Sequence, residues 1–194
     1  MGREVHRSDP RGHGHPLKFI QIRLKGAYIV QPEPLTDERG FFARTWCIRE
    51  FESRGLETRL VQCNISYNRS KGTLRGMHYQ TPPFDEDKLV RCTRGAIHDV
   101  IIDLRKNSMT FGKHIGFTLT AENRTMLYVP KGFAHGFLTL EDGSEVHYQM
   151  SEFYAPECAQ GIRWDDPYFG VEWPGEVRVI SEKDRSYPDF VPLG

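Results

Sequence analysis

The stretch YVPKGFAHGFLTL, residues 128–140, holds the clearest turn and strand signals of this sequence. Pro130 and Gly132 are residues that favour a change of chain direction, because proline fixes φ and glycine adopts backbone angles that other residues avoid. Beyond them the apolar residues resume in a pattern that is typical of a strand. We therefore expect a turn that leads into a strand opening with His135.

The same strand pattern recurs along most of the chain. Short alternating segments are separated by turn signals such as DERG, NRSKG, RKNS and EDGS. One short helix is expected near residues 48–55, with Gly55 at its end. Many short strands with turns at regular intervals predict an all-β protein, best a double-sheet jelly roll with short peripheral helices. The expected strands span 17–24, 27–32, 40–48, 72–80, 88–95, 96–105, 114–120, 126–130, 135–140 and 145–154.

Length and composition narrow the class of protein. The length of 194 residues predicts one domain, over 17–194. Residues 1–16 are expected to form a mobile lead-in, where His13 and His15 are weak candidates for metal binding. Lys plus Arg and Asp plus Glu both number 26, so no net charge favours nucleic acid or an acidic membrane surface. No apolar run suits a membrane span or a secretory signal. The widely spaced cysteines predict reduced thiols in a cytoplasmic protein; they are Cys47, Cys63, Cys92 and Cys158.

The segment GTLRGMHYQ, residues 72–80, brings Arg75 and His78 into a run that otherwise looks like a strand. Gly72 and Gly76 interrupt it, which indicates a bent or closely approached backbone. Taken alone, a structural histidine is the simpler interpretation. Further on, Lys88, Tyr148, Lys183 and Asp184 could join a site, but their spacing cannot show that they converge.

A first resemblance concerns residues 130–137. PKGFAHGF resembles the PxGxxHxF signature of the cupin jelly roll, whose metal-binding members add a pair of histidines spaced HxH and a glutamate. Here the matching earlier strand has Gln80 two residues after His78, so the second histidine is missing. Two imidazoles and an amide make a poor metal site. A metal-dependent cupin oxygenase or isomerase is therefore the weaker alternative, and His78 becomes a candidate general base.

A second resemblance covers roughly residues 25–190. An ordered set of motifs closely resembles the dTDP-4-dehydrorhamnose 3,5-epimerase family. The resemblance implies a cupin-type jelly roll, a homodimer, no metal or other cofactor, and epimerisation at C3 and C5 of a small-molecule partner, a nucleotide-linked 4-keto-6-deoxy sugar. The motifs are DERGFF (37–42), VQCN (61–64), GTLRGMHYQ (72–80), KLVRC (88–92), PKGFAHGF (130–137), YAPE (154–157), WDDP (164–167), EWP (172–174) and SEKD (181–184).

The resemblance also implies the roles of four catalytic residues. His78 would be the base, and Asp184 would orient it, although Asp165 and Asp166 are rival partners on sequence grounds. Lys88 would stabilise the oxygen of the enolate intermediate. Tyr148 would be the acid on the opposite face of the sugar, with a packed phenol as its simpler interpretation.

The substrate-binding residues that the resemblance implies gather around the nucleotide. Guanidinium groups match phosphate oxygens, amides suit the nucleotide, and an aromatic ring can stack on the base. His135 is expected to donate near the ketone. The full set is Arg39, Gln62, Asn64, Arg75, His135, Phe153 and Lys183.

Three departures from the family pattern affect the expected nucleotide end. Ala43 and Arg44 follow GFF where an acidic residue can sit, Phe153 replaces a tyrosine, and Ala159 replaces an acidic residue. The identity of the base therefore stays open. Three alternative functions also stay open. They are inversion of a single carbon, action on another nucleotide sugar, and a catalytically silent binding module on the same scaffold.

Overall fold

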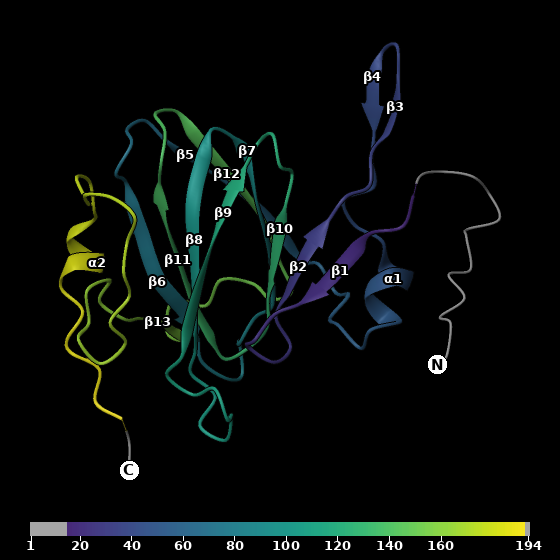
Figure 1. Ribbon diagram of the computed structural model, residues 1–194. Coiled ribbons are helices and arrows are strands. Elements are labelled where there is room, and N and C mark those ends of the chain that lie inside the picture. Colours follow the sequence, from purple (N-terminus) through teal and green to yellow (C-terminus); the bar gives the residue numbers. More distant parts are fainter. Residues whose placement is uncertain (1–14, 193–194) are drawn as a thin grey trace.

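The computed structural model describes residues 15–192, in which two antiparallel sheets pack face to face (Figure 1). The six-stranded sheet has the order β1-β2-β10-β7-β12-β5, and the five-stranded sheet has the order β13-β6-β11-β8-β9. The first contains β1 (Lys18–Gln21), β2 (Tyr28–Gln31), β10 (Met126–Val129), β7 (Lys88–Arg94), β12 (Ser144–Met150) and β5 (Gln62–Asn68). The second contains β13 (Ala159–Gly161), β6 (Leu74–Gln80), β11 (Phe133–Thr139), β8 (Ala96–Asp103) and β9 (His114–Thr120).

Three smaller elements lie outside the two sheets. β3 (Leu35–Asp37) and β4 (Gly40–Phe42) form a separate hairpin that projects from the body (Figure 1). The helix α1 (Ile48–Glu52) lies beside β1, and α2 (Glu182–Arg185) lies beside β6. Both helices are short and peripheral, as the sequence predicts.

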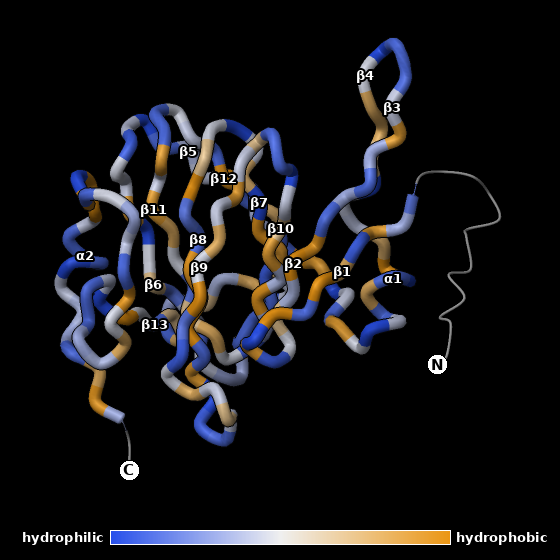
Figure 2. Tube along the Cα trace, viewed as in Figure 1, coloured by the Kyte–Doolittle hydropathy of each residue, from blue (hydrophilic) through white to orange (hydrophobic). Residues whose placement is uncertain are grey.

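The main core fills the space between the sheets, and period-two alternation builds it. On β10, Leu127 and Val129 point into this core, whereas Met126 and Tyr128 pack on the outer face beneath α1. Figure 2 shows that apolar segments lie on the sheet strands and that the β3–β4 hairpin has a polar tip. The alternation therefore fixes which side chains can face an internal site.

The outer faces of the sheets are covered by other parts of the chain. Phe51 of α1 packs against the outer face of the six-stranded sheet. The segment after β13 covers the five-stranded sheet, where Ile162 and Phe169 pack against Met77 and Ile102. This cover carries the chain back along β6 and brings α2 to the edge of the sandwich.

A bulge in β6 changes the direction of the side chains around Gly76. Arg75 pairs with Phe137 and His78 pairs with His135, so three steps on β6 oppose two on β11. Gly76 has a φ of 127°, and a Cβ there would lie 2.5 Å from the Cα of Gly136. Residues three apart in a regular strand point to opposite faces, so the extra residue lets Arg75 and His78 share one face.

The predicted all-β double-sheet fold is confirmed, but several strand boundaries are wrong. The predicted strand 40–48 is a strand only at Gly40–Phe42, because Trp46 packs on Phe51 and the chain turns into α1. The predicted strand 145–154 ends at Met150, and 17–24 ends at Gln21. Lead-in residues 1–14, including His13, lie outside the described residues. Within residues 15–192, no helix is long and apolar enough to cross a membrane.

Candidate active site

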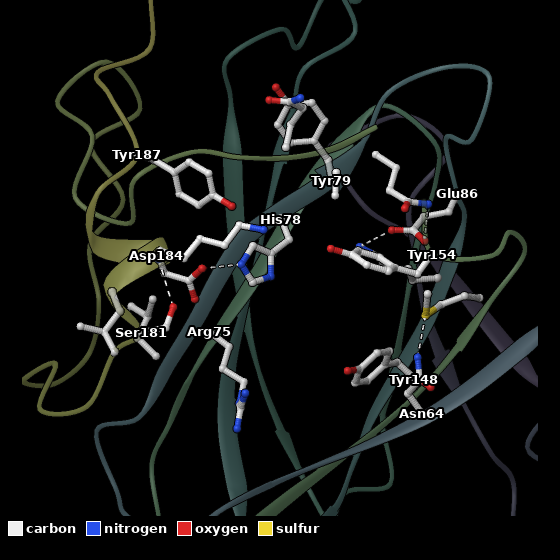
Figure 3. A pocket seen from close by; sticks show the side chains of 18 of the residues that line it. Asn64, Arg75, His78, Tyr79, Glu86, Tyr148, Tyr154, Ser181, Asp184 and Tyr187 are labelled. Atoms are coloured by element: carbon white, nitrogen blue, oxygen red, sulfur yellow. Dashed lines mark hydrogen bonds and ion pairs between the residues drawn. The ribbon is translucent and has the colours of Figure 1, made fainter. Parts of the chain in front are cut away.

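A cavity of about 710 Å³ opens between the two sheets, beside α2 (Figure 3). Inward-facing residues of β5, β6, β7 and β12 form its walls, and the segment around α2 closes one side. All four predicted catalytic residues and four of the seven predicted substrate-binding residues line it: His78, Lys88, Tyr148, Asp184, Gln62, Asn64, Arg75 and Lys183.

His78 and Asp184 form the shortest polar contact in the cavity wall, with 2.6 Å between His78 Nε2 and Asp184 Oδ1. The side chain of Ser181 caps α2 by accepting a hydrogen bond from the backbone N–H of Asp184, which fixes the carboxylate at the helix. The rival partners are engaged elsewhere: Asp165 pairs with Arg163, and Asp166 accepts the backbone N–H groups of Tyr168 and Phe190.

The carboxylate of Asp184 is nearly inaccessible to solvent, whereas the ring of His78 is 45% exposed toward the cavity. Burial alone would raise the pKa of Asp184, but hydrogen bonds and charge attraction from His78 outweigh it, and the pKa is lowered. An ionised carboxylate only accepts, so Nε2 carries the proton that binds Asp184. That assignment leaves Nδ1 of His78 with a free lone pair.

Tyr148 faces this pair from across the cavity (Figure 3). Its strand β12 belongs to the six-stranded sheet, whereas His78 belongs to the five-stranded sheet. Burial raises the pKa of the Tyr148 phenol, the positive charge of Arg75 opposes that effect, and the negative charge of Glu86 adds to it. The phenol is therefore a protonated group that lies opposite a basic imidazole.

Lys88 is the first residue of β7, and its side chain is 11% exposed. Its ammonium lies 2.9 Å from Glu86 Oε1, and the Glu86 side chain is itself 7% exposed. Lys88 and Tyr148 thus bring a cation and a proton donor to one wall of the cavity.

The other polar residues of the cavity wall interact with their neighbours. Arg75 Nε donates to Asn68 Oδ1 at 2.7 Å, which leaves the other guanidinium nitrogens available to a ligand. Gln62 Nε2 donates to Asn64 Oδ1 at 3.2 Å, and both side chains face the cavity. Lys183 lines the wall next to Asp184.

Three predicted substrate-binding residues do not line this cavity. Arg39 lies at the turn of the projecting hairpin, where it pairs with Asp37 and its side chain is 84% exposed. His135 is buried on β11, where it pairs directly with His78 of the neighbouring strand β6, and its Nε2 lies 2.9 Å from Asp99 Oδ2. Phe153 is exposed beside the rim, while its neighbour Tyr154 lines the wall.

Among the lining residues that sequence reasoning missed are Tyr79, Glu86, Tyr154 and Tyr187. Glu86 precedes Lys88 by two residues, a spacing that places both on one face of an extended chain. The ring of Tyr187 fits only because residue 161 is glycine, since a Cβ there would lie 2.1 Å from the ring.

The donor set does not suit a metal ion. Gln80 is committed to backbone groups of Phe84 and Ala155, and His135 is committed to Asp99. Within the described range, no group of three or more His, Cys, Asp or Glu residues could hold an ion. Arg44, one departure from the family pattern, pairs with Glu50 of α1 and lies outside the cavity wall.

The fold and the site together define a double-sheet jelly-roll protein with an acid–base pocket between its sheets. The family model for dTDP-4-dehydrorhamnose 3,5-epimerase matches residues 21–191. This chain therefore belongs to the dTDP-4-dehydrorhamnose 3,5-epimerase family, which confirms the resemblance seen in the sequence.

Individual relatives cover nearly the whole chain. A dTDP-4-dehydrorhamnose 3,5-epimerase of Methanothermobacter thermautotrophicus is 49% identical over 88% of this chain and 93% of its own length. A crystal structure of the enzyme from Elizabethkingia anophelis is 40% identical with a TM-score of 0.88, covering 91% of this chain and 97% of that one. The Legionella pneumophila enzyme, in complex with dTDP-4-keto-L-rhamnose, is 37% identical with a TM-score of 0.82 and covers 87% and 90%.

Proposed function

We propose that this protein is an isomerase that inverts C3 and C5 of dTDP-4-dehydro-6-deoxyglucose to give dTDP-4-dehydrorhamnose. The observation that carries the proposal is the convergence of His78, Asp184, Tyr148 and Lys88 on one cavity of about 710 Å³. Family membership supports this choice of substrate. Relatives are named dTDP-4-dehydrorhamnose 3,5-epimerase, and one solved structure of similar fold holds dTDP-4-keto-L-rhamnose.

The chemistry follows from the 4-keto group, which acidifies the hydrogens on both neighbouring carbons. His78 Nδ1 takes a proton from one face, and the C–H electron pair moves into an enolate. Asp184 stabilises the imidazolium that forms. Lys88 stabilises the enolate oxygen, because an ammonium interacts more strongly with developing negative charge than with a ketone. Tyr148 then gives a proton to the opposite face of the same carbon, and this completes inversion.

Substrate binding would use the remaining polar walls. Arg75 and Lys183 suit the diphosphate, and Gln62 and Asn64 suit the nucleoside. We propose that His135, the β11 partner of His78, acts near the ketone, and that Phe153 is a stacking group beside Tyr154. None of these residues requires a metal ion, so we propose metal-independent turnover.

We also infer a homodimer, because Arg39 could then serve as the predicted phosphate ligand. Arg39 lies on a hairpin that projects from its own body, so it would have to bind in a partner's pocket (Figure 1). The edge strands β1 and β5 support pairing, since Ile65 and Tyr67 of β5 are exposed. The four free cysteines support a reducing, cytoplasmic location.

Incubation with dTDP-4-keto-6-deoxyglucose in D₂O tests the reaction directly. We expect deuterium at C3 and C5 and a product of inverted configuration at both carbons. Label and inversion at one carbon alone would replace the proposal by single-carbon epimerisation. Turnover that requires stoichiometric iron or manganese would replace it by a metal-dependent cupin, and binding without proton exchange by a silent module.

A further inference from the structure

The ammonium of Lys88 belongs to a buried chain of polar contacts. The other members of this chain, Glu86 and Gln80, have no role in the proposed mechanism. Lys88 Nζ contacts Glu86 Oε1 at 2.9 Å. The other oxygen of the same carboxylate, Oε2, accepts a hydrogen bond from Gln80 Nε2 at 3.2 Å. Glu86 therefore uses one oxygen for a cation of the cavity and the other for an amide of β6.

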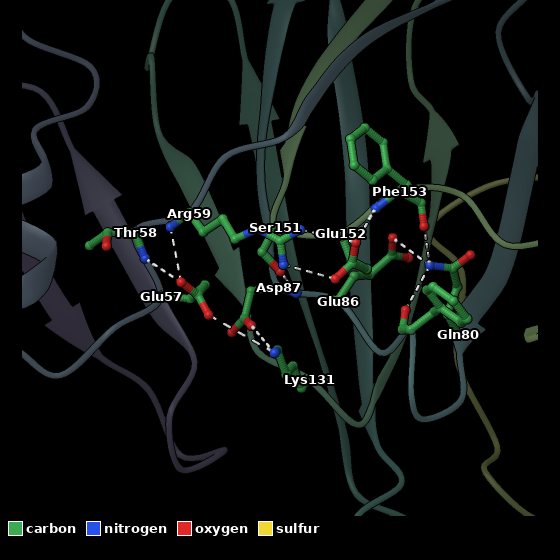
Figure 4. A network of polar contacts seen from close by, with 11 residues as sticks. Glu57, Thr58, Arg59, Gln80, Glu86, Asp87, Lys131, Ser151, Glu152 and Phe153 are labelled. Atoms are coloured by element: carbon green, nitrogen blue, oxygen red, sulfur yellow. Dashed lines mark hydrogen bonds and ion pairs between the residues drawn. The ribbon is translucent and has the colours of Figure 1, made fainter.

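Gln80 connects this carboxylate to the aromatic segment 153–155 (Figure 4). Its Nε2 also lies 2.8 Å from the carbonyl oxygen of Phe84 and 3.1 Å from that of Phe153, and its Oε1 accepts the backbone N–H of Ala155 at 2.7 Å. Tyr154, between these two anchored residues, lines the cavity. The position of Lys88 and the position of Tyr154 thus depend on one hydrogen-bonded chain.

The contact between Glu86 and Lys88 is buried, so little water competes with Glu86 for the ammonium. An ammonium has three donors and a long flexible stem, so its direction is set by the acceptors around it. With Glu86 holding one N–H group, the remaining donors are directed to other acceptors, including a ligand in the cavity. A neutral amide at position 86 would offer one acceptor oxygen in place of two and would remove the negative charge that attracts the Lys88 ammonium.

We propose that Glu86 is a positioning residue for this reaction: its carboxylate holds Lys88 Nζ against the substrate ketone and fixes that ammonium relative to the aromatic segment 153–155. The inference rests on the proposed function, in which Lys88 stabilises the enolate. Glu86 itself exchanges no proton with the sugar.

A double-mutant cycle between Glu86 and Lys88 tests the inference, with kcat, KM and deuterium wash-in measured for each variant. Glu86→Gln should lower kcat at least about tenfold with KM within about threefold, because Lys88 would be misplaced in the transition state more than in binding. Lys88→Met should lower kcat further. The double variant should be no slower than Lys88→Met alone, since Glu86 has nothing left to position.

Conservative and control variants separate positioning from folding. Glu86→Asp keeps the charge and should have a kcat between wild type and Glu86→Gln. It also completes the cycle with Lys88→Met if Glu86→Gln does not fold. Glu145→Gln, which changes a half-buried carboxylate of β12 that accepts a hydrogen bond from Thr93, should keep wild-type kcat. Thermal unfolding and binding of thymidine diphosphate verify that each variant is folded.

The outcomes distinguish this inference from the proposed function. Additive losses in the double variant, or a wild-type kcat in Glu86→Gln beside an inactive Lys88→Met, would overturn the role of Glu86 alone. A Glu86→Asp variant no faster than Glu86→Gln would also overturn it. Full activity in Lys88→Met, or wild-type protein without turnover, would instead overturn the proposed function.

Discussion

The imidazole of His78 and the carboxylate of Asp184 lie 2.6 Å apart, although 106 residues separate them in the chain. β6 supplies the ring, and a four-residue helix, α2, supplies the acid. Because Asp184 is buried and ionised, it selects the tautomer with the proton on Nε2. This pair determines which nitrogen of His78 can act as a base.

The first prediction concerns Asp184→Asn and His78→Ala. An amide can donate to Nε2, which would favour the proton on Nδ1, the atom that accepts the substrate proton in the proposed mechanism. We expect kcat to fall by about 10²-fold or more in Asp184→Asn, and turnover to vanish in His78→Ala. Thymidine diphosphate should bind to both variants within about threefold of wild type, as measured by calorimetry. An equal loss of binding and turnover would make the pair structural.

The second prediction concerns Tyr148, the acid of the proposed mechanism. Tyr148→Phe removes the proton donor but keeps His78, so wash-in of deuterium from D₂O should continue while inversion falls by about 10²-fold or more. NMR of the recovered substrate and product measures both. Unchanged inversion would remove Tyr148 from the role of acid.

The pH dependence of inversion should follow the raised pKa of the Tyr148 phenol. An acid must be protonated to act, and this pKa lies above the ordinary tyrosine value of about 10. The wild-type enzyme should therefore keep its proton donor up to about pH 10. Any fall in rate as the pH rises toward 10 should affect deuterium exchange and inversion equally. A loss of inversion alone near pH 8 would contradict this assignment.

The fourth prediction concerns stability. The fully buried carboxylate of Asp103 accepts hydrogen bonds from Arg105, Ser108 and Thr110 at the end of β8. Burial opposes ionisation, but these bonds outweigh it and lower the pKa of Asp103 from 3.8 to about 2. The lowered pKa contributes roughly 2 kcal/mol of stability above pH 4, and this contribution is lost as the pH falls from about 4 to 2.

Asp103→Asn should therefore lower the free energy of unfolding by about 2–4 kcal/mol at pH 7, since one acceptor oxygen must replace two. Denaturant unfolding at pH 7 and at successively lower pH measures this difference. The gap between wild type and variant should narrow below pH 4. A gap that stays constant down to pH 2 would mean that ionisation of Asp103 contributes nothing.

The sequence predicts much of this architecture because period-two alternation survives on strands with one face in the core. β12 is such a strand, because Val146 and Tyr148 pack on the core whereas Glu145 and His147 alternate with them. The alternation gives the wrong face at β5, an edge strand whose apolar Ile65 and Tyr67 face outward. The pattern of QCNISYN therefore does not indicate the core side. The alternation also fails at residues 43–47, where propensity favours a strand but no partner strand is near.

The convergence of the site depends on features that spacing does not encode. Arg75 and His78 share a face only because of the bulge at Gly76, and Asp184 reaches His78 only because the chain after β13 returns along β6. The resemblance to a known family supplied those positions. It did not supply Glu86, Tyr79 or Tyr187, which belong to this chain's own cavity wall.

The last prediction concerns Arg39, which is exposed on the β3–β4 hairpin and outside the cavity of its own chain. If it binds the diphosphate of a substrate held by a partner, Arg39→Ala should raise KM about tenfold or more, the equivalent of one charge-assisted hydrogen bond, with little change in kcat. Initial rates over a range of substrate concentrations measure this effect.

Mixed dimers decide between action within one chain and action across the dimer. A dimer of one Arg39→Ala chain and one His78→Ala chain has a single intact pocket if Arg39 acts on the partner, and none if it acts on its own chain. Random co-assembly of the two variants should then restore roughly a quarter of wild-type activity at low substrate concentration, because half of the dimers are mixed and each has one working site of two. Activity no higher than the sum of the separate variants would place Arg39 outside the partner's pocket and leave the hairpin without a role in binding.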